Sequence, residues 1–133
     1  MRKLIWSLPL LLLLFSCGDG RTELEKAQEG AMVAAETYYG FLLNGSYEQF
    51  LQGREGMAGI PDSFREQLLT TYKQFMAQQA KAHGGIRSVK SSRAVPDSSL
   101  NVMQVFLLLN YQDASTEEIV VPMVQDGDQW LMR

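Results

Sequence analysis

Cysteine and histidine each occur only once in the 133 residues, as Cys17 and His83. A single thiol excludes a disulfide within the chain, so an ordinary apolar core has to supply the stability. A lone histidine and a lone cysteine also make no zinc site, and no acidic run has the spacing of a calcium loop. The glycines at 53, 56 and 59 lack the Lys-Ser/Thr of a phosphate-binding loop. We therefore expect no metal and no cofactor.

Long apolar runs are confined to the start of the chain. Arg2 and Lys3 precede an apolar stretch, 4–15, that is shorter than the about 20 residues needed to span a bilayer. Residues 1–16 are therefore predicted to be an export signal rather than a membrane anchor. Residues 14–17, Leu-Phe-Ser-Cys, resemble a bacterial lipobox. That resemblance implies a lipid on Cys17, which we favour over an intermolecular disulfide through the same thiol. It also implies a protein of the bacterial cell envelope that is anchored to the outer membrane or to the periplasmic side of the inner membrane.

Basic residues are in the minority, with 12 Lys and Arg against 15 Asp and Glu. Loss of Arg2 and Lys3 with the signal takes the formal charge from −3 to −5. This balance argues against nucleic acid as a partner. Arg87, Lys90 and Arg93 lie close in sequence, but strict alternation places Lys90 on the opposite face of a strand from the other two. A solvated edge strand is thus favoured over a phosphate site.

The segment 17–22 is predicted to be a lipidated tether, and 23–133 one folded domain. Apolar residues spaced by three and four predict a first helix over about 23–43, with Thr22 as its cap. A short helix follows from Ser46, and a third runs from about 61 to 83 before Gly84-Gly85. Ser63 and Glu66 have the capping-box spacing at its start.

The run 100–111, LNVMQVFLLLNY, predicts a central strand. One of its faces is uniformly apolar and is expected to meet the helices: Met103, Val105, Leu107, Leu109 and Tyr111. Further strands are predicted over 86–95, 118–125 and 128–133, with an Asp126-Gly127 hairpin before the last. Pro122 predicts a bulge or an unpaired position. The fold class is α+β: three N-terminal helices packed on one face of a curved four-stranded antiparallel sheet.

Three segments resemble small bacterial lipoproteins of the nuclear-transport-factor-2-like (NTF2-like), or cystatin-like, superfamily. They are Ala-Ala-Glu-Thr-Tyr-Tyr at 34–39, Asn-Gly-Ser-Tyr-Glu-Gln-Phe at 44–50 and the Asp-Gly-Asp-Gln-Trp region within 121–133. The resemblance implies a cone whose mouth opens between helices and sheet, and pairing of two copies through the outer sheet face. It implies hardly any chemistry, because this superfamily contains enzymes, binders and assembly modules.

Catalytic residues are not evident in the sequence. His83 is beside a helix end, where a cation suits the helix dipole without any catalytic role. The acids expected to lie in or beside turns, and to be solvated, are Asp113, Glu117, Glu118, Asp126 and Asp128. We therefore expect no enzymatic activity, with a small isomerase or dehydratase as the alternative.

The sequence supplies the residues of a concave apolar binding surface more readily than those of a catalytic site. The predicted binding residues for a small apolar ligand are Tyr39, Tyr72, Met76, Met103, Tyr111 and Trp130. Phe106 and Leu108 would otherwise form an exposed patch on the outer sheet face, so a homodimer through that face is also expected. The sequence thus predicts a lipid-anchored, non-catalytic binding or assembly module.

Overall fold

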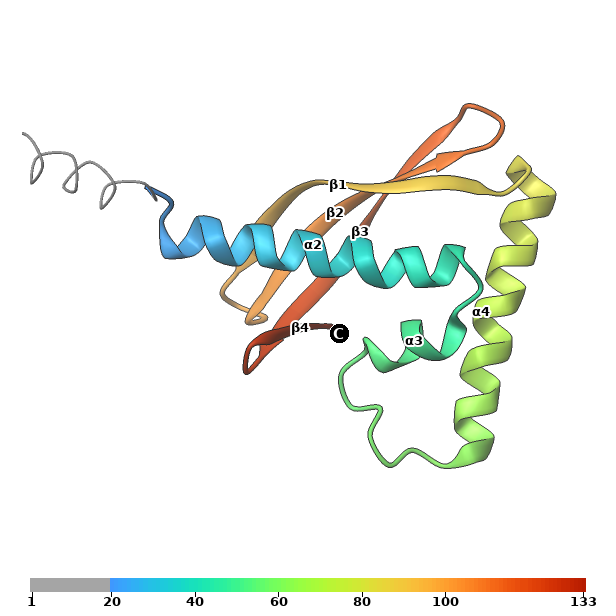
Figure 1. Ribbon diagram of the computed structural model, residues 1–133, viewed down its shortest axis with the longest axis horizontal. Helices are drawn as coiled ribbons and strands as arrows, with labels where there is room; N and C mark the ends of the chain where they lie inside the picture. The colour runs from blue at the N-terminus through green and yellow to red at the C-terminus, as the bar shows by residue number, and fades with distance from the viewer. Residues whose placement is uncertain (1–19) are drawn as a thin grey trace, which may run out of the picture.

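The computed structural model describes residues 20–133 and has helices on one side of a single sheet (Figure 1). The sheet is antiparallel throughout, with strand order β1-β2-β3-β4. The elements are α2 (Glu23–Leu43), α3 (Tyr47–Gln52), α4 (Asp62–His83), β1 (Ile86–Asp97), β2 (Val102–Tyr111), β3 (Thr116–Asp126) and β4 (Gln129–Met132). The predicted α+β class and the three-helix, four-strand order are confirmed. The predicted signal at 1–16 and the lipid site at Cys17 lie outside the described residues.

Helix α2 lies directly on the sheet. Its start is closed by a capping box in which the Glu25 backbone N–H donates to Thr22 Oγ1 at 3.1 Å, and Glu25 accepts from the Thr22 backbone N–H. Ala31 and Ala35 are 0% exposed, because small side chains allow the helix backbone to approach the strands closely. Glu36 also joins α2 to β1 by accepting from the backbone N–H of Ser91 at 3.0 Å and from its hydroxyl.

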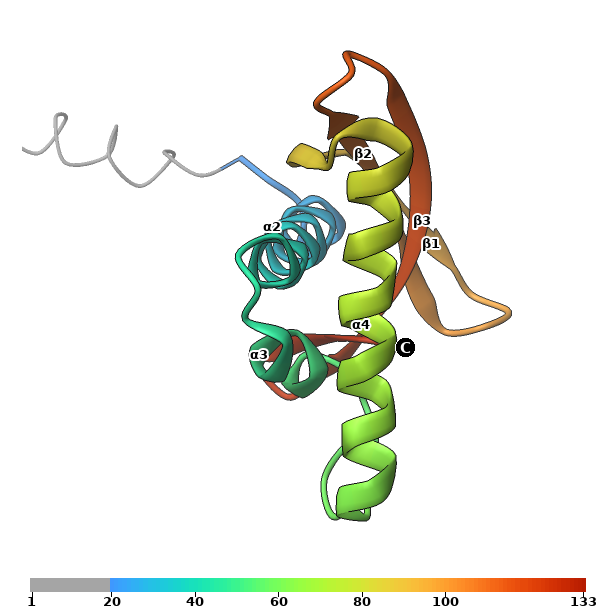
Figure 2. The same cartoon turned by 90° about the vertical axis from the view of Figure 1, so that its right-hand side faces the viewer.

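Helix α4 runs across the direction of α2, and α3 packs against both helices (Figures 1 and 2). The helix begins after Pro61, whose extended ψ of 149° precedes the first turn without a side-chain cap. The predicted capping box of Ser63 and Glu66 is therefore wrong, since Ser63 already lies within the first turn. The helix ends at Gly84, which has the left-handed φ of 76° that a glycine adopts without strain.

The side chains of strand β2 alternate between a buried inner face and a less buried outer face, as predicted. Its inner face, from Met103 through Leu107 to Tyr111, is at most 6% exposed and packs under the helices. Phe106 and Leu108 on the outer face are only half-buried. No helix of the described chain covers that outer face (Figures 1 and 2). The sheet therefore has one packed side and one open side.

Strand β1 corrects one prediction. A register shift between Ser91 and Arg93 makes Ser92 an extra residue. Lys90 then pairs with Leu108 and Arg93 with Phe106, so both cations lie on the outer face together. The Arg93 guanidinium carbon is 3.7 Å from the centroid of the Phe106 ring. Strict alternation failed here because a bulge changes the face of every residue beyond it.

Strands β3 and β4 form the predicted hairpin, with Gly127 at a φ of 62°. Pro122 causes no bulge, since it pairs with Gln104 in an unbroken register. Its carbonyl accepts from the Arg133 backbone N–H at 2.9 Å, so its nitrogen also faces the β4 side and the β2–β3 ladder loses no donor. Strand β4 is further held by the Met132 backbone N–H, which donates to the Gly53 carbonyl at 2.7 Å.

Candidate functional site

A cavity of about 430 Å³ lies between the helices and the inner face of the sheet. All three helices and the two central strands contribute to its walls. The walls are largely apolar, and four of the lining side chains are aromatic. The lining residues are Tyr39, Leu42, Phe50, Thr71, Tyr72, Phe75, Gln79, Leu109, Glu117 and Ile119.

Three aromatic rings make one wall of this cavity. Phe50 of α3 packs edge to face against Tyr39 of α2, with ring centroids 5.2 Å apart, and against Tyr72 of α4 at 4.9 Å. The interplanar angles are 87° and 86°, the geometry that places the positive ring edge on the negative ring face. Because Phe50 is only 6% exposed, this wall belongs to the core and is rigid.

The two tyrosine hydroxyls occupy different electrostatic surroundings. Burial raises the pKa of Tyr39, with Tyr72 adding to the effect and Arg54 opposing it. Arg54 Nη1 donates to the hydroxyl oxygen of Tyr72 at 3.2 Å. The raised pKa keeps the Tyr39 phenol protonated, so that its hydroxyl can donate to an uncharged acceptor, while the Tyr72 oxygen already accepts from Arg54.

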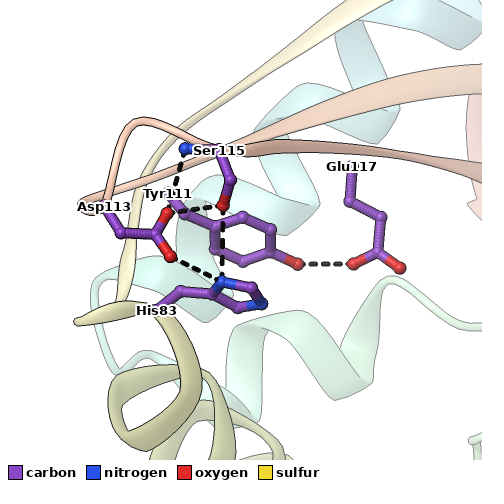
Figure 3. Close-up of polar contacts among 5 residues, drawn as sticks. All are labelled: His83, Tyr111, Asp113, Ser115 and Glu117. Atoms are coloured by element: carbon purple, nitrogen blue, oxygen red, sulfur yellow. Dashed lines mark hydrogen bonds and ion pairs between the residues drawn. The ribbon is translucent and has the colours of Figure 1, made fainter.

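Glu117 places a carboxylate on the cavity wall. It pairs with Leu109 across the sheet and so lies on the inner face, two residues before Ile119. The Tyr111 hydroxyl donates to Glu117 Oε1 at 2.5 Å (Figure 3). Burial of the Tyr111 ring, the bond to Glu117 and the charges of Glu117 and Asp113 raise the pKa of Tyr111 to about 12. Among the described residues that line the cavity, Glu117 alone carries a charge at neutral pH.

His83 lies behind this carboxylate (Figure 3) and is not a wall residue. Its ring stacks on Tyr111 with centroids 4.0 Å apart, and its Nδ1 is 2.9 Å from Asp113 Oδ2. Ser115 Oγ is 3.4 Å from the same ring nitrogen, so the three residues lack the relay of a Ser-His-Asp triad, which uses both nitrogens.

The His83 and Asp113 pair instead joins the end of α4 to the β2–β3 turn. The Asp113 backbone N–H donates to the His83 carbonyl at 3.1 Å, beside the side-chain contact. Hydrogen bonds from Ser115 and then from His83 lower the pKa of Asp113 to about 2. This cluster holds in place the β2–β3 turn, after which Glu117 lies near the start of β3.

The six predicted binding residues are not brought together. Tyr39 and Tyr72 line the cavity, and Tyr111 supports it from behind while only 1% exposed. Met76 packs against the core cluster. Met103 and Trp130 line a separate, more polar depression of about 650 Å³ beside the β1–β2 turn and Arg133.

Glu117 was not among the predicted site residues, because the sequence placed it in or beside a turn. Strand β3 begins at Thr116, earlier than predicted, because Glu117 already pairs with Leu109. The signal was present: counting back by twos from Met123, Val121 and Ile119 assigns Glu117 to the apolar face.

No protein-family model matches this sequence, and no curated protein matches it significantly. Among solved structures, a Campylobacter jejuni protein provisionally named an NTF2-like transpeptidase superposes with a TM-score of 0.55 at 14% identity, covering 74% of this chain and 92% of that one. This chain has the NTF2-like fold. The likeness confirms the predicted fold resemblance and carries no chemistry, since identity is low. Within residues 20–133, no helix is both long and apolar enough to cross a membrane.

Proposed function

We propose that this NTF2-like protein is a lipid-anchored, non-catalytic binding protein of the bacterial cell envelope that holds a small apolar ligand in its inner cavity. The observation that supports binding is the aromatic wall of Tyr39, Phe50 and Tyr72 around about 430 Å³, a volume in the range of small-molecule sites. A few polar groups at the same walls are available to orient the ligand.

Binding is tested with a neutral aromatic probe, 3-phenylpropan-1-ol, by calorimetric titration of the full-length chain. Thr71 lines the cavity and is exposed, so Thr71→Trp should fill the entrance without disturbing the core. We expect this variant to lose probe binding, while Thr70→Trp, one position along the same helix and outside the cavity walls, should retain it. Absence of binding to the unmodified chain, or equal binding by Thr71→Trp, would overturn the proposal.

Lipid anchoring is proposed from the lipobox resemblance at Cys17. Only five residues, 18–22, separate Cys17 from the first residue of α2. Even fully extended, they reach about 17 Å, so a lipid there would keep the domain at the membrane surface. Mass spectrometry of the natively expressed protein should find an acylated Cys17, and Cys17→Ser should release the protein from the membrane fraction. An unmodified, soluble Cys17 form would exclude the anchor.

Enzymatic proton transfer is the second candidate, and Glu117 is the observation in its favour. A carboxylate and two tyrosine hydroxyls from residues that line one apolar cavity are the groups that a proton-transfer isomerase needs. Burial, however, raises the pKa of Tyr39 and so makes its hydroxyl a poorer proton donor. Exchange of the α-proton of cyclic ketones in deuterated water, lost in Glu117→Gln, would favour the enzyme.

The outer sheet face is proposed as a contact between two copies of this chain. Val95 is 41% and Val120 49% exposed on either side of Phe106, in positions where a second sheet would bury them. Sedimentation should detect a dimer that Val120→Lys dissociates. Val33→Lys, at a still more exposed valine on α2, is the control and should leave the dimer intact. A monomer at tens of micromolar would reject the interface.

A further inference from the structure

We infer that the ligand of the inner cavity is a hydrophobic ammonium: a protonated amine on an apolar, ring-sized body. This inference rests on the proposed binding function and specifies the chemical class of its ligand. The observation that carries it is the combination, on one cavity surface, of a wall of aromatic rings with a single carboxylate, Glu117.

The carboxylate has capacity for a further hydrogen bond. An ionised carboxylate offers two oxygens and about four acceptor positions. Tyr111 donates to Oε1 of Glu117 from behind at 2.5 Å, and the 1% exposure of Tyr111 fixes that donor in place. The bond holds Oε1 and leaves other acceptor positions on this exposed carboxylate, at the cavity wall, for a donor from the ligand. A positively charged N–H donor satisfies them best, because charge-assisted hydrogen bonds are about twice as strong as neutral ones.

The aromatic wall suits the apolar body of the same ligand. Aromatic side chains bury large apolar areas and so favour a ring-sized apolar group over a small polar one. Phe75, together with the packed rings of Tyr39, Phe50 and Tyr72, gives the apolar body of such a ligand its contacts. An anion such as a fatty acid would instead meet the charge of Glu117 without a cationic wall residue to offset it.

Arg54 is the cation that contacts the aromatic wall, through the hydroxyl of Tyr72. Arg54 reaches Tyr72, seven residues and therefore about two helical turns along α4 from Gln79. Glu117 is bonded to Tyr111, which stacks on His83 at the end of α4. His83 lies eleven residues beyond Tyr72, so an ammonium at Glu117 lies away from Arg54. A ligand with an additional acceptor would reach the hydroxyl of Tyr72, which gives the site a defined direction.

The experiment compares three probes of one shape on the full-length chain: 3-phenylpropylammonium, 3-phenylpropan-1-ol and 3-phenylpropanoate. Calorimetric titration at neutral pH should give the ammonium an affinity at least about tenfold above the alcohol, with the carboxylate weakest. Glu117→Gln should remove the preference for the ammonium over the alcohol. Glu118→Gln is the matched control, because it removes the same charge from the outer face of the same strand and should keep the preference.

The outcomes separate this inference from the proposed function. Binding of the alcohol with no preference for the ammonium, or a preference that survives Glu117→Gln, would overturn the ammonium inference and leave the binding function intact. Equal loss of the preference in both glutamine variants would attribute it to overall charge and overturn the inference as well. Failure of all three probes to bind would reject the binding function itself.

Discussion

Tyr111 donates its hydroxyl hydrogen to Glu117 Oε1 at 2.5 Å while its ring stacks on His83, so one buried side chain joins the cavity wall to the end of α4. The two strands concerned are consecutive, and Glu117 lies six residues beyond Tyr111. The intervening turn is fixed by Asp113 and Ser115. The position of the one charged wall residue therefore depends on this hairpin end, and the predictions begin there.

Replacement of Tyr111 by Phe should weaken the protein below pH 10 and have little effect near pH 12. The folded state raises the pKa of Tyr111 from its ordinary 10.0 to about 12, so its contribution is complete below pH 10 and is lost as the pH rises toward 12. Tyr111→Phe should cost about 1 kcal/mol at pH 8 through the lost hydrogen bond. It should also show a shallower decline in the free energy of unfolding between pH 10 and 12. Denaturant titrations at pH 8 and at pH 12 test this. Tyr47→Phe is the control and should decline in free energy of unfolding between pH 10 and 12 as steeply as the unmodified chain.

Replacement of Asp113 by Asn should flatten the acid limb of the stability curve. The pKa of Asp113 falls from 3.8 to about 2 in the folded state, so the stabilisation is present above pH 4 and disappears as the pH falls toward 2. Urea midpoints measured at pH 6, 4 and 2.5 should therefore fall less steeply in Asp113→Asn. Ser115→Ala removes the largest cause of the lowered pKa and should change the slope in the same direction; an unchanged slope in both variants would contradict the assignment.

Gly53 should not tolerate a methyl group. A Cβ there would lie 2.4 Å from Cδ1 of Tyr38, whose hydroxyl is held by the Trp130 carbonyl at 2.6 Å and so cannot easily move. Gly53→Ala should lower the free energy of unfolding by about 1–3 kcal/mol. Gly40→Ala is the control: nothing lies within 4 Å of its Cβ position inside α2, and it should stabilise by about 0.5–1 kcal/mol. Thermal unfolding of the two variants should shift in opposite directions.

Replacement of Glu36 on α2 should lower the free energy of unfolding, because this side chain joins the helix to β1. Its carboxylate accepts two hydrogen bonds from Ser91, which is 9% exposed. Glu36→Ala leaves those donors unpaired at the edge of the sheet and should cost about 1–3 kcal/mol. Glu66→Ala, an exposed acid on α4, should stay within about 0.5 kcal/mol of the unmodified chain. Equal denaturant midpoints for the two variants would show that Glu36 does not fasten α2 to the sheet.

The helices and the central strand were predictable because their signals are local. The bounds 23–43 follow from Thr22 and Glu25 at one end and Asn44-Gly45 at the other, all within hydrogen-bonding range of the helix termini. Alternation along 102–111 identified the packed face correctly, since a strand has a fixed period of two. The fold class then followed from the order of these elements.

The candidate site was only partly predictable, because its parts come from five elements. Tyr39 and Tyr72 were named from their positions on apolar helix faces, which is a local property. Met103 and Trp130 were named for the same reason, as large apolar side chains, yet they line a different depression. The curvature of the sheet and the path of β4 decide which end of the core each side chain reaches.

Local chemistry along the chain thus determined where helices start and stop, which strand is central and which of its faces is buried. Tertiary structure alone decided that Lys90 joins Arg93 on the outer face, since the bulge at Ser92 leaves no local signal. It also decided that Glu117, bonded to Tyr111, lines the same cavity as aromatic rings from three separate helices. Periodicity assigns a residue to a face, whereas only packing between distant segments determines which side chains on that face become neighbours.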